Sequence, residues 1–469
     1  MDQLNKKKLF RDLAREYRST HKKSMAAIRQ ASRFLVKGGS HNLRLFEPFP
    51  FIDTQASGSR VKDIDGRTYV DFWQGHFANI LGHNPRVVTR ALEREFRKGR
   101  GLATGFPGEC QWELARLILG RLKTDKIRFT TSGTLASMYA VMLSMASTKR
   151  DLVFKIGGGW HGAQPYLLKG ISTYRHGLTE IESAGLPPGA EAVVEVLKFN
   201  DLDDLEEKFK AHGENLAGLI LEPFIGAGGF IFTRPEYLRR ARELTQQYGA
   251  LLIFDEVVSG FRFCPGGLQT LYGIKPDLTV LGKAIGGGMP IGALAGREDV
   301  MALCAPDAKP GEKVKFDGGT FSGHPAVMTA GLVFLRYLIK EADRIYPRMG
   351  RLAVLARKEI ERIFAGQGFK VRCTGDSDDL GIASSLLGVH FVGEKTERID
   401  SPEQVWNPEV SDFELREKIF KLAMLQEGFN IFHGYGSISA AHSPADIEAS
   451  LEAVEKIARK WSQYRVHRN

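Results

Sequence analysis

The sequence predicts an α/β protein with a large domain, built on a mostly parallel sheet covered by helices, and a smaller α+β domain at the C-terminus. Between about 85 and 330, short apolar runs alternate with helical segments, which is typical of parallel strands buried on both faces. Several of these runs end in a polar residue, and ligands of such sheets bind beyond the carboxyl ends of the strands. Beyond 330, long helical stretches and a few strand candidates describe the smaller unit.

The N-terminal part is expected to differ from the rest. Residues 1–36 read as an amphipathic, basic helical arm that the sequence KGGS at 37–40 interrupts. Strand-like runs at 49–52 and 68–72, with an Asp65-Gly66 turn before the second run, indicate a hairpin.

Periodicity predicts the remaining elements. They divide the chain into segments 1–75 (arm and hairpin), 76–330 (large ligand-binding domain) and 331–469 (small domain). In the large domain we expect helices at 86–98, 109–121, 134–147 and 235–248, and strands at 127–130, 152–155, 219–221, 251–254 and 278–281. In the small domain we expect helices up to 364, at 411–426 and at 445–463, and strands at 369–373 and 386–392.

Composition describes an ordinary globular protein. It is 43% hydrophobic and 26% charged, and its 51 glycines exceed the usual share of about 7%. The four cysteines lie far apart, no metal-ligand motif occurs, and no apolar leader or membrane-length run is present, so we expect a cytoplasmic protein without metal or membrane contact. Much of the net charge of +10 is spread through helical segments in which acids are interleaved. The one dense basic stretch is the N-terminal arm, where a solvated helix face is favoured over a nucleic-acid site.

Two strand ends carry the chemistry. Lys283 follows the run at 278–281 and precedes a glycine-rich stretch, and Asp255 ends the run at 251–254. Pyridoxal 5′-phosphate needs an amine that forms a Schiff base with its aldehyde and a carboxylate that keeps its ring nitrogen protonated. The alternatives are a surface lysine and an aspartate that caps a helix.

Sequence blocks around these two residues resemble the class III (subgroup II) aminotransferases of fold type I, which depend on pyridoxal phosphate. The likeness covers roughly 40–460 and is nearest to the branch of glutamate-1-semialdehyde 2,1-aminomutase and β-amino-acid aminotransferases. The blocks are TSGTLAS at 131–137, GWHG at 159–162, LEP at 221–223, DEVVSGFR at 255–262 and GGTFSGHP at 318–325.

The resemblance implies roles around the cofactor ring. Lys283 would form the Schiff base and then carry the proton as general base and acid. Asp255 would pair with the ring nitrogen, and Val257 would lie against one ring face unless it is simply a core valine. Trp160 stands where the family has a stacking tyrosine or phenylalanine, and His161 follows it in a direct or a structural role.

The resemblance also implies a phosphate site, a substrate side and a second subunit. Ser132, Gly133 and Thr134 open a helix whose N–H groups would bind the phosphate, although Ser-Gly-Thr is also an ordinary N-cap turn. Thr320 would reach the phosphate of a neighbouring subunit, which implies a homodimer. Substrate contacts would come from Glu222, Trp73 and Arg44, the last binding a carboxylate unless it is a surface arginine.

These expectations favour an aminotransferase that moves an amino group from a carboxylate-bearing amine or amino acid to a keto or aldehyde acceptor by a ping-pong mechanism. Intramolecular transfer by an aminomutase is the alternative, and a racemase or epimerase is a more distant one. The aminomutase is less favoured because the segments FWQGHFA at 72–78 and GYG at 434–436 depart from that branch.

Two readings outside this chemistry are weaker. The run GGGWHG at 157–162 fits a dinucleotide-binding fingerprint, but Pro165 and an irregular stretch follow it instead of a helix, which argues against an NAD(P)-dependent oxidoreductase. A non-catalytic binding protein is disfavoured because the catalytic positions are intact.

Overall fold

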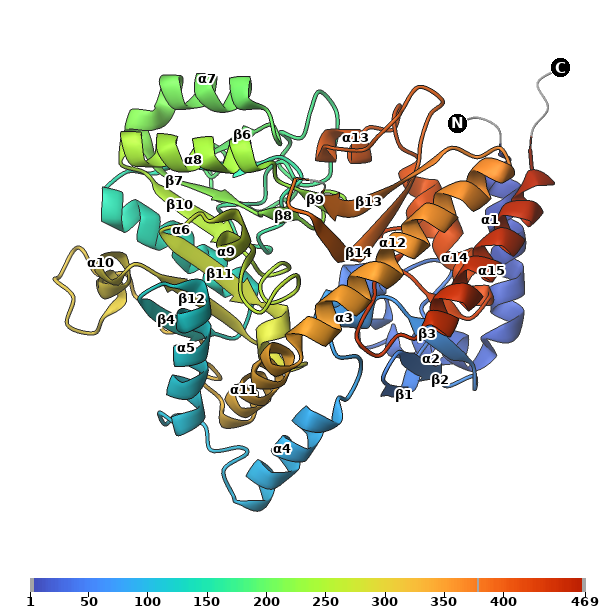
Figure 1. Ribbon diagram of the computed structural model, residues 1–469, viewed down its shortest axis with the longest axis horizontal. Coiled ribbons are helices and arrows are strands. Elements are labelled where there is room, and N and C mark those ends of the chain that lie inside the picture. Colours follow the sequence, from blue (N-terminus) through green and yellow to red (C-terminus); the bar gives the residue numbers. More distant parts are fainter. Residues whose placement is uncertain (1–3, 378, 466–469) are drawn as a thin grey trace.

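The computed structural model describes residues 4–377 and 379–465, and its centre is a seven-stranded sheet (Figure 1). The strand order is β4-β12-β11-β10-β7-β5-β6, and only β12 runs antiparallel to its neighbours. The prediction of a mostly parallel sheet is therefore confirmed. The strands are β4 (Lys126–Thr130), β5 (Leu152–Ile156), β6 (Val194–Leu197), β7 (Leu216–Leu221), β10 (Leu251–Asp255), β11 (Leu278–Gly282) and β12 (Gly292–Gly296).

Helices cover both faces of this sheet. Along β10, Leu252 and Phe254 belong to one buried cluster together with residues of α8, whereas Leu251 and Ile253 belong to another together with residues of α6. Successive strand residues point to opposite faces, so this division places the two helices on opposite sides. The helices of this part are α4 (Arg86–Arg97), α5 (Glu109–Leu122), α6 (Gly133–Thr148), α7 (Leu202–His212), α8 (Pro235–Tyr248) and α9 (Leu268–Tyr272).

The N-terminal segment differs from its prediction. The arm is two helices, α1 (Lys6–Thr20) and α2 (Lys22–Ala31), separated at the buried His21, and residues 1–3 of the predicted arm lie outside the described residues. The strand predicted at 49–52 is wrong. Pro50 has no N–H for a ladder, and the strand begins only at β1 (Asp53–Ser57).

A hairpin with its turn at Asp65-Gly66 does form, but its first strand is β2 (Arg60–Asp63) and not the predicted run at 49–52; its second strand is β3 (Thr68–Asp71). On its other edge, β3 pairs with β15 (Phe429–Asn430), which comes from the far end of the chain. The N-terminal sheet therefore contains one C-terminal strand, and the division at 75 and 330 stays a prediction.

The C-terminal part packs a small antiparallel sheet against long helices. The helical stretch predicted up to 364 is two helices, and the helix predicted at 411–426 begins as a π-helical turn, η6, before α14. The elements are α11 (Pro325–Lys340), α12 (Ala342–Gly366), β13 (Val371–Ser377), β14 (Ile382–Phe391), α13 (Pro402–Trp406), η6 (Leu415–Phe420), α14 (Lys421–Gln426), β16 (Gly436–Ser437) and α15 (Pro444–Ser462).

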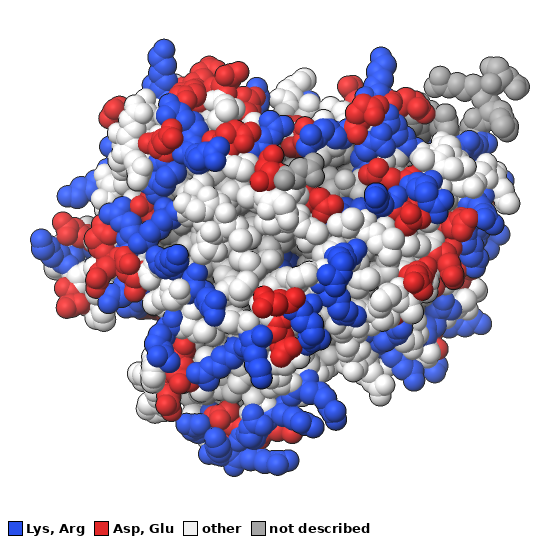
Figure 2. All heavy atoms as spheres, viewed as in Figure 1, with Lys and Arg blue, Asp and Glu red and all other residues white. Residues whose placement is uncertain are grey.

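Surface charge is mixed over the face drawn in Figure 2. Acidic side chains lie among the basic ones, and the densest basic group lies at the end of the molecule that α4 occupies in Figure 1. In α1, Leu9, Leu13, Ala14 and Tyr17 are buried, so its basic residues occupy the opposite, solvated face. No helix within 4–377 and 379–465 is long and apolar enough to cross a membrane.

Candidate active site

Four of the predicted site residues lie at one edge of the large sheet. Ser132 follows β4, Glu222 follows β7, Asp255 ends β10, and Lys283 follows β11. These four strands run in the same direction, so their carboxyl ends meet at the same edge. Because β10 and β11 are neighbours in register, with Asp255 opposite Val280, Asp255 and Lys283 leave adjacent strands.

Asp255 is buried, with a carboxylate that is held from two sides. Its Oδ2 accepts a hydrogen bond from Nδ1 of His161 at 2.8 Å, and its Oδ1 accepts one from the Val257 N–H at 3.0 Å. A carboxylate can only accept here, so the His161 proton lies on Nδ1. Burial lowers the pKa of His161, and the neighbouring Asp255 opposes that shift. Each carboxylate oxygen retains a lone pair for a further donor.

Glu222 lies in a comparable environment. Its Oε1 accepts from the Trp160 N–H and its Oε2 from the Gly226 N–H, both at 2.9 Å. Burial, followed by repulsion from Asp255, raises the pKa of Glu222 to about 8. The hydrogen bonds from the two amides and the charge of Lys283 oppose this shift. Glu222 therefore holds the backbone beside the Trp160 indole, which itself is 43% exposed.

Lys283 begins a short 3₁₀ turn in a left-handed conformation, with φ +46°. Residues other than glycine seldom adopt this conformation, and such strain collects at functional sites. The side chain is half-buried. Burial lowers the pKa of the Lys283 ammonium. The negative charges of Asp255 and Glu222 oppose this shift, and the positive charge of Arg262 increases it. A lowered pKa leaves more of the amine unprotonated and nucleophilic.

Close glycine contacts shape the start of α6. A Cβ on Gly133 would lie 2.9 Å from Val257, and a Cβ on Gly162 would lie 2.4 Å from Oγ1 of Thr134. Ser132 caps α6 by accepting the Leu135 N–H at 3.3 Å. The first N–H groups of a helix have no partner within it, so this end can bind an anion. The predicted phosphate residues are therefore together at the strand ends.

The remaining predicted residues lie around this centre. Thr320 is exposed. A Cβ on the preceding residue, Gly319, would lie 3.3 Å from Oγ1 of Thr131. Arg44 is exposed in a turn (Asn42–Arg44). The Trp73 ring stacks on Phe432, with centroids 4.9 Å apart.

Sequence reasoning missed His76, which lies beside Trp73 and His41. Its ring is 4.6 Å from that of Trp73 and 4.7 Å from that of His41. Burial, together with the charges of His41, Arg44, Lys283 and His433, lowers the pKa of His76 to about 3. Arg44 and Lys283 thus act on one imidazole. The available sequence signal was the departure of FWQGHFA at 72–78 from the related branch.

Within the described ranges, 4–377 and 379–465, no group of three or more His, Cys, Asp or Glu side chains is arranged to hold a metal ion.

The raised pKa of Glu222 predicts a pH effect on the cofactor-free protein. In the folded state the Glu222 carboxyl group keeps its proton up to about pH 8, whereas in the unfolded state it loses the proton near pH 4.5. The stability that Glu222 contributes is therefore fully present below pH 4.5 and is lost as the pH rises toward about 8. Relative to Glu222→Gln, the free energy of unfolding should fall by up to about 1.4 kcal/mol per pH unit in that window. Urea unfolding of both proteins at several pH values measures this, and a constant difference would contradict it.

Comparison with known proteins gives a consistent result. The family model described as aminotransferase class-III matches residues 45–363. The chain is 35% identical to a glutamate-1-semialdehyde 2,1-aminomutase of Thermodesulfovibrio yellowstonii, over 93% of this chain and 99% of that protein.

Several solved structures are similar over nearly the whole chain, and two of them are transaminases at 28–29% identity. A β-phenylalanine aminotransferase from Variovorax paradoxus superposes with a TM-score of 0.85 at 28% identity, covering 99% of this chain and 100% of that one. An omega-transaminase from Sphaerobacter thermophilus superposes with a TM-score of 0.83 at 29% identity, covering 95% and 99%.

Proposed function

The chain belongs to the class-III aminotransferases, enzymes that depend on pyridoxal 5′-phosphate, and from that premise we propose that it transfers an amino group between two small molecules in two half-reactions. The donor is a carboxylate-bearing amine or amino acid, and the acceptor is a ketone or aldehyde. The observation that carries the proposal is the placement of Lys283 and Asp255 at the ends of adjacent strands, within the family match.

The residues present fit the cofactor. Asp255 is a buried carboxylate with acceptor capacity left for a ring N–H, the glycine contacts at 133 and 162 leave no room for larger side chains, and the N-terminus of α6 suits a phosphate. Lys283, Asp255, Val257, Trp160 and the residues Ser132 to Thr134 would hold it. When bound, pyridoxal phosphate supplies an aldehyde that condenses with amines and a ring that accepts electrons.

Each side chain then has a defined role. Lys283 anchors the cofactor, removes the proton from the substrate carbon that bears the amino group, and returns a proton to the acceptor carbon in the second half-reaction. Asp255 keeps the ring nitrogen protonated, and His161 orients Asp255 through the 2.8 Å hydrogen bond. Glu222 positions the backbone of Trp160. Arg44 binds the substrate carboxylate with its guanidinium fork.

Intramolecular transfer is the second candidate, because relatives at 34–35% identity are glutamate-1-semialdehyde 2,1-aminomutases. Two observations favour the intermolecular reaction. The segment at 72–78 and the segment at 434–436 depart from that branch, and the side chains on this side of the site include His76 and His433. Departures from that branch at both segments support a different substrate.

The half-reactions separate the two candidates. Purified holoenzyme mixed with a donor amine and no acceptor is expected to convert its cofactor once and stop, because each enzyme molecule can accept only one amino group. A keto acid added afterwards should restore turnover. Cofactor absorbance and keto product are measured together. Sustained turnover of glutamate-1-semialdehyde with no second substrate would instead establish the aminomutase.

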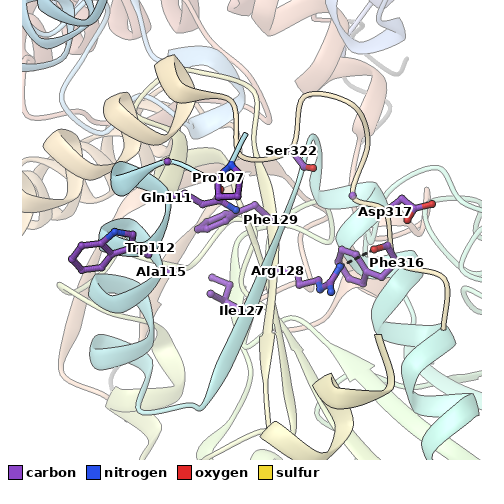
Figure 3. A pocket seen from close by; sticks show the side chains of 12 residues that line it. Pro107, Gln111, Trp112, Ala115, Ile127, Arg128, Phe129, Phe316, Asp317 and Ser322 are labelled. Carbon is purple, nitrogen blue, oxygen red and sulfur yellow. Dashed lines mark hydrogen bonds between the residues drawn. The ribbon is translucent and has the colours of Figure 1, made fainter. Parts of the chain in front are cut away.

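A homodimer forms part of this proposal. Exposed apolar side chains collect near α5 and the segment that carries Thr320, with exposed fractions of 74% for Leu102, 76% for Phe106, 55% for Trp112 and 62% for Phe321. A cavity of about 450 Å³ lies beside them, lined by α5, β4 and the segment at 316–322 (Figure 3). Apolar surface of this kind marks a protein interface, and a second copy there would bring Thr320 to its partner's site.

A further inference from the structure

The peptide group between Gly159 and Trp160 is held at both ends by buried side chains. Nζ of Lys155 donates a hydrogen bond to the Gly159 carbonyl oxygen at 3.1 Å. The Trp160 N–H, at the other end of the same peptide group, donates to Oε1 of Glu222 at 2.9 Å. Both Lys155 and Glu222 are buried. Together they fix the plane of one peptide group, and with it the point from which the Trp160 side chain leaves the backbone.

The Lys155 ammonium makes two further hydrogen bonds to the loop that follows β5. It donates to the carbonyl oxygens of Leu167 at 3.3 Å and Lys169 at 2.6 Å. An ammonium has three N–H donors, so three carbonyl groups match its charged form, whereas a neutral amine would leave one of them without a partner. Lys155 therefore ties the start of the loop to its return.

The start of this loop has little rigidity of its own. Gly157, Gly158 and Gly159 follow β5 directly, and Gly158 adopts a φ of +82°. Glycine permits this left-handed turn, but it loses more conformational freedom on folding than any other residue. Hydrogen bonds from an ionised group are stronger than those between neutral groups. The bond from Lys155 therefore supplies an order that the glycine run does not.

The residues after Gly159 run along the cofactor site. His161 follows Trp160, and its Nδ1 donates to Oδ2 of Asp255 at 2.8 Å. Gly162 comes next, and a Cβ on it would collide with Thr134 at the start of α6. The Trp160 indole is 43% exposed, so part of its surface is free for a ligand. The loop thus carries an open ring past the carboxylate that would pair with the cofactor nitrogen.

We propose that Lys155 is a positioning residue of the cofactor site, which acts through the peptide group between Gly159 and Trp160 to hold the indole against the cofactor ring. Lys155 is not a catalytic residue, because its three N–H donors are used by loop carbonyl groups. This inference rests on the proposed function, since it concerns the cofactor of the same site.

Release of pyridoxamine 5′-phosphate from the loaded enzyme tests this role. This vitamer has no aldehyde and forms no imine with Lys283, so contacts to its ring contribute directly to its retention. After a chase with excess pyridoxal 5′-phosphate, we expect Lys155→Met to release it about tenfold faster than the wild type, the factor that a good aromatic contact provides. In the Trp160→Ala background the same substitution should change the rate less than about twofold, because no ring remains to be positioned.

Lys169→Met is the matched control. Lys169 lies in the same loop, and its Nζ also donates to carbonyl groups, those of Glu191 at 3.2 Å and Val194 at 2.8 Å. Because it does not bind the peptide group before Trp160, its replacement should leave release unchanged in both backgrounds. Lys155→Gln, which keeps N–H donors but has no charge, is a second variant. Absorbance before the chase shows which proteins are folded and loaded.

Two results would overturn the proposal. Equal acceleration of release with and without the indole would show that Lys155 stabilises the fold and does not act through Trp160. An unchanged rate in the Lys155 variants, with the indole present, would show that the ring is held without this lysine. Neither result depends on a donor or an acceptor, so absence of the half-reactions would overturn the proposed function alone.

Discussion

Replacement of Lys283 by alanine is expected to abolish multiple turnover, with kcat falling by about 10²–10⁴-fold, the usual contribution of a positioned general base. The lysine leaves β11 in a strained conformation and is half-buried, where the charges of Asp255 and Glu222 act on its pKa. The rate of transamination and the cofactor absorbance of the variant measure the effect.

Lys155 provides the matched comparison. It is completely buried, and burial lowers its pKa to about 7, so it is also a candidate for a reactive amine. Its Nζ, however, donates to the carbonyl groups of Gly159, Leu167 and Lys169. Borohydride reduction of the holoenzyme followed by peptide mapping should place the label on residue 283 and none on 155. A label on Lys155, or full activity in Lys283→Ala, would contradict the assignment.

Asp255→Asn is expected to lower kcat by about 10²–10³-fold, the usual cost of removing one preorganised electrostatic group. The amide has nearly the same shape but no charge, so it would not keep a ring nitrogen protonated. It would also change the partner of His161 Nδ1. Steady-state kinetics and the cofactor's absorbance spectrum are measured together, because loss of the protonated ring should change both.

The control for this substitution is Asp277→Asn. Asp277 is also buried and charged, but it lies before β11, at the opposite edge of the sheet, where it pairs with Arg242 and Arg297 at 2.8 Å. Its replacement should lower the free energy of unfolding and leave the spectrum and kcat of the folded enzyme unchanged. Equal losses of kcat in the two variants would show that Asp255 acts only through stability.

The strand-end residues could be predicted because the signal is local. A run of apolar residues followed by Asp or Lys marks a strand and its carboxyl end together, so Asp255 and Lys283 needed no knowledge of distant contacts. The same signal fails for β12 (GALAG at 292–296), since its residues are too small to read as a strand. A Cβ on Gly292 would lie 2.1 Å from the Ser132 carbonyl oxygen, so tertiary contact determines that sequence.

The substrate side could not be predicted in this way. His76 and Phe432 come from separate segments, and only the fold brings them together. The left-handed backbone at Gln74, His76 and Phe77 has no local sequence signal either, because these residue types do not favour positive φ. Asp71, which imposes that conformation through the Trp73 and Gln74 N–H groups, looks in the sequence like the end of an ordinary strand.

The pairing of β3 with β15 also governs when the enzyme becomes complete during translation. All seven strands of the large sheet have been made once residue 296 is synthesised, but the edge of β3 has no partner until Asn430 leaves the ribosome. Phe432, which stacks on Trp73, follows two residues later. A nascent chain can therefore build the platform that carries Lys283 long before the N-terminal sheet is complete.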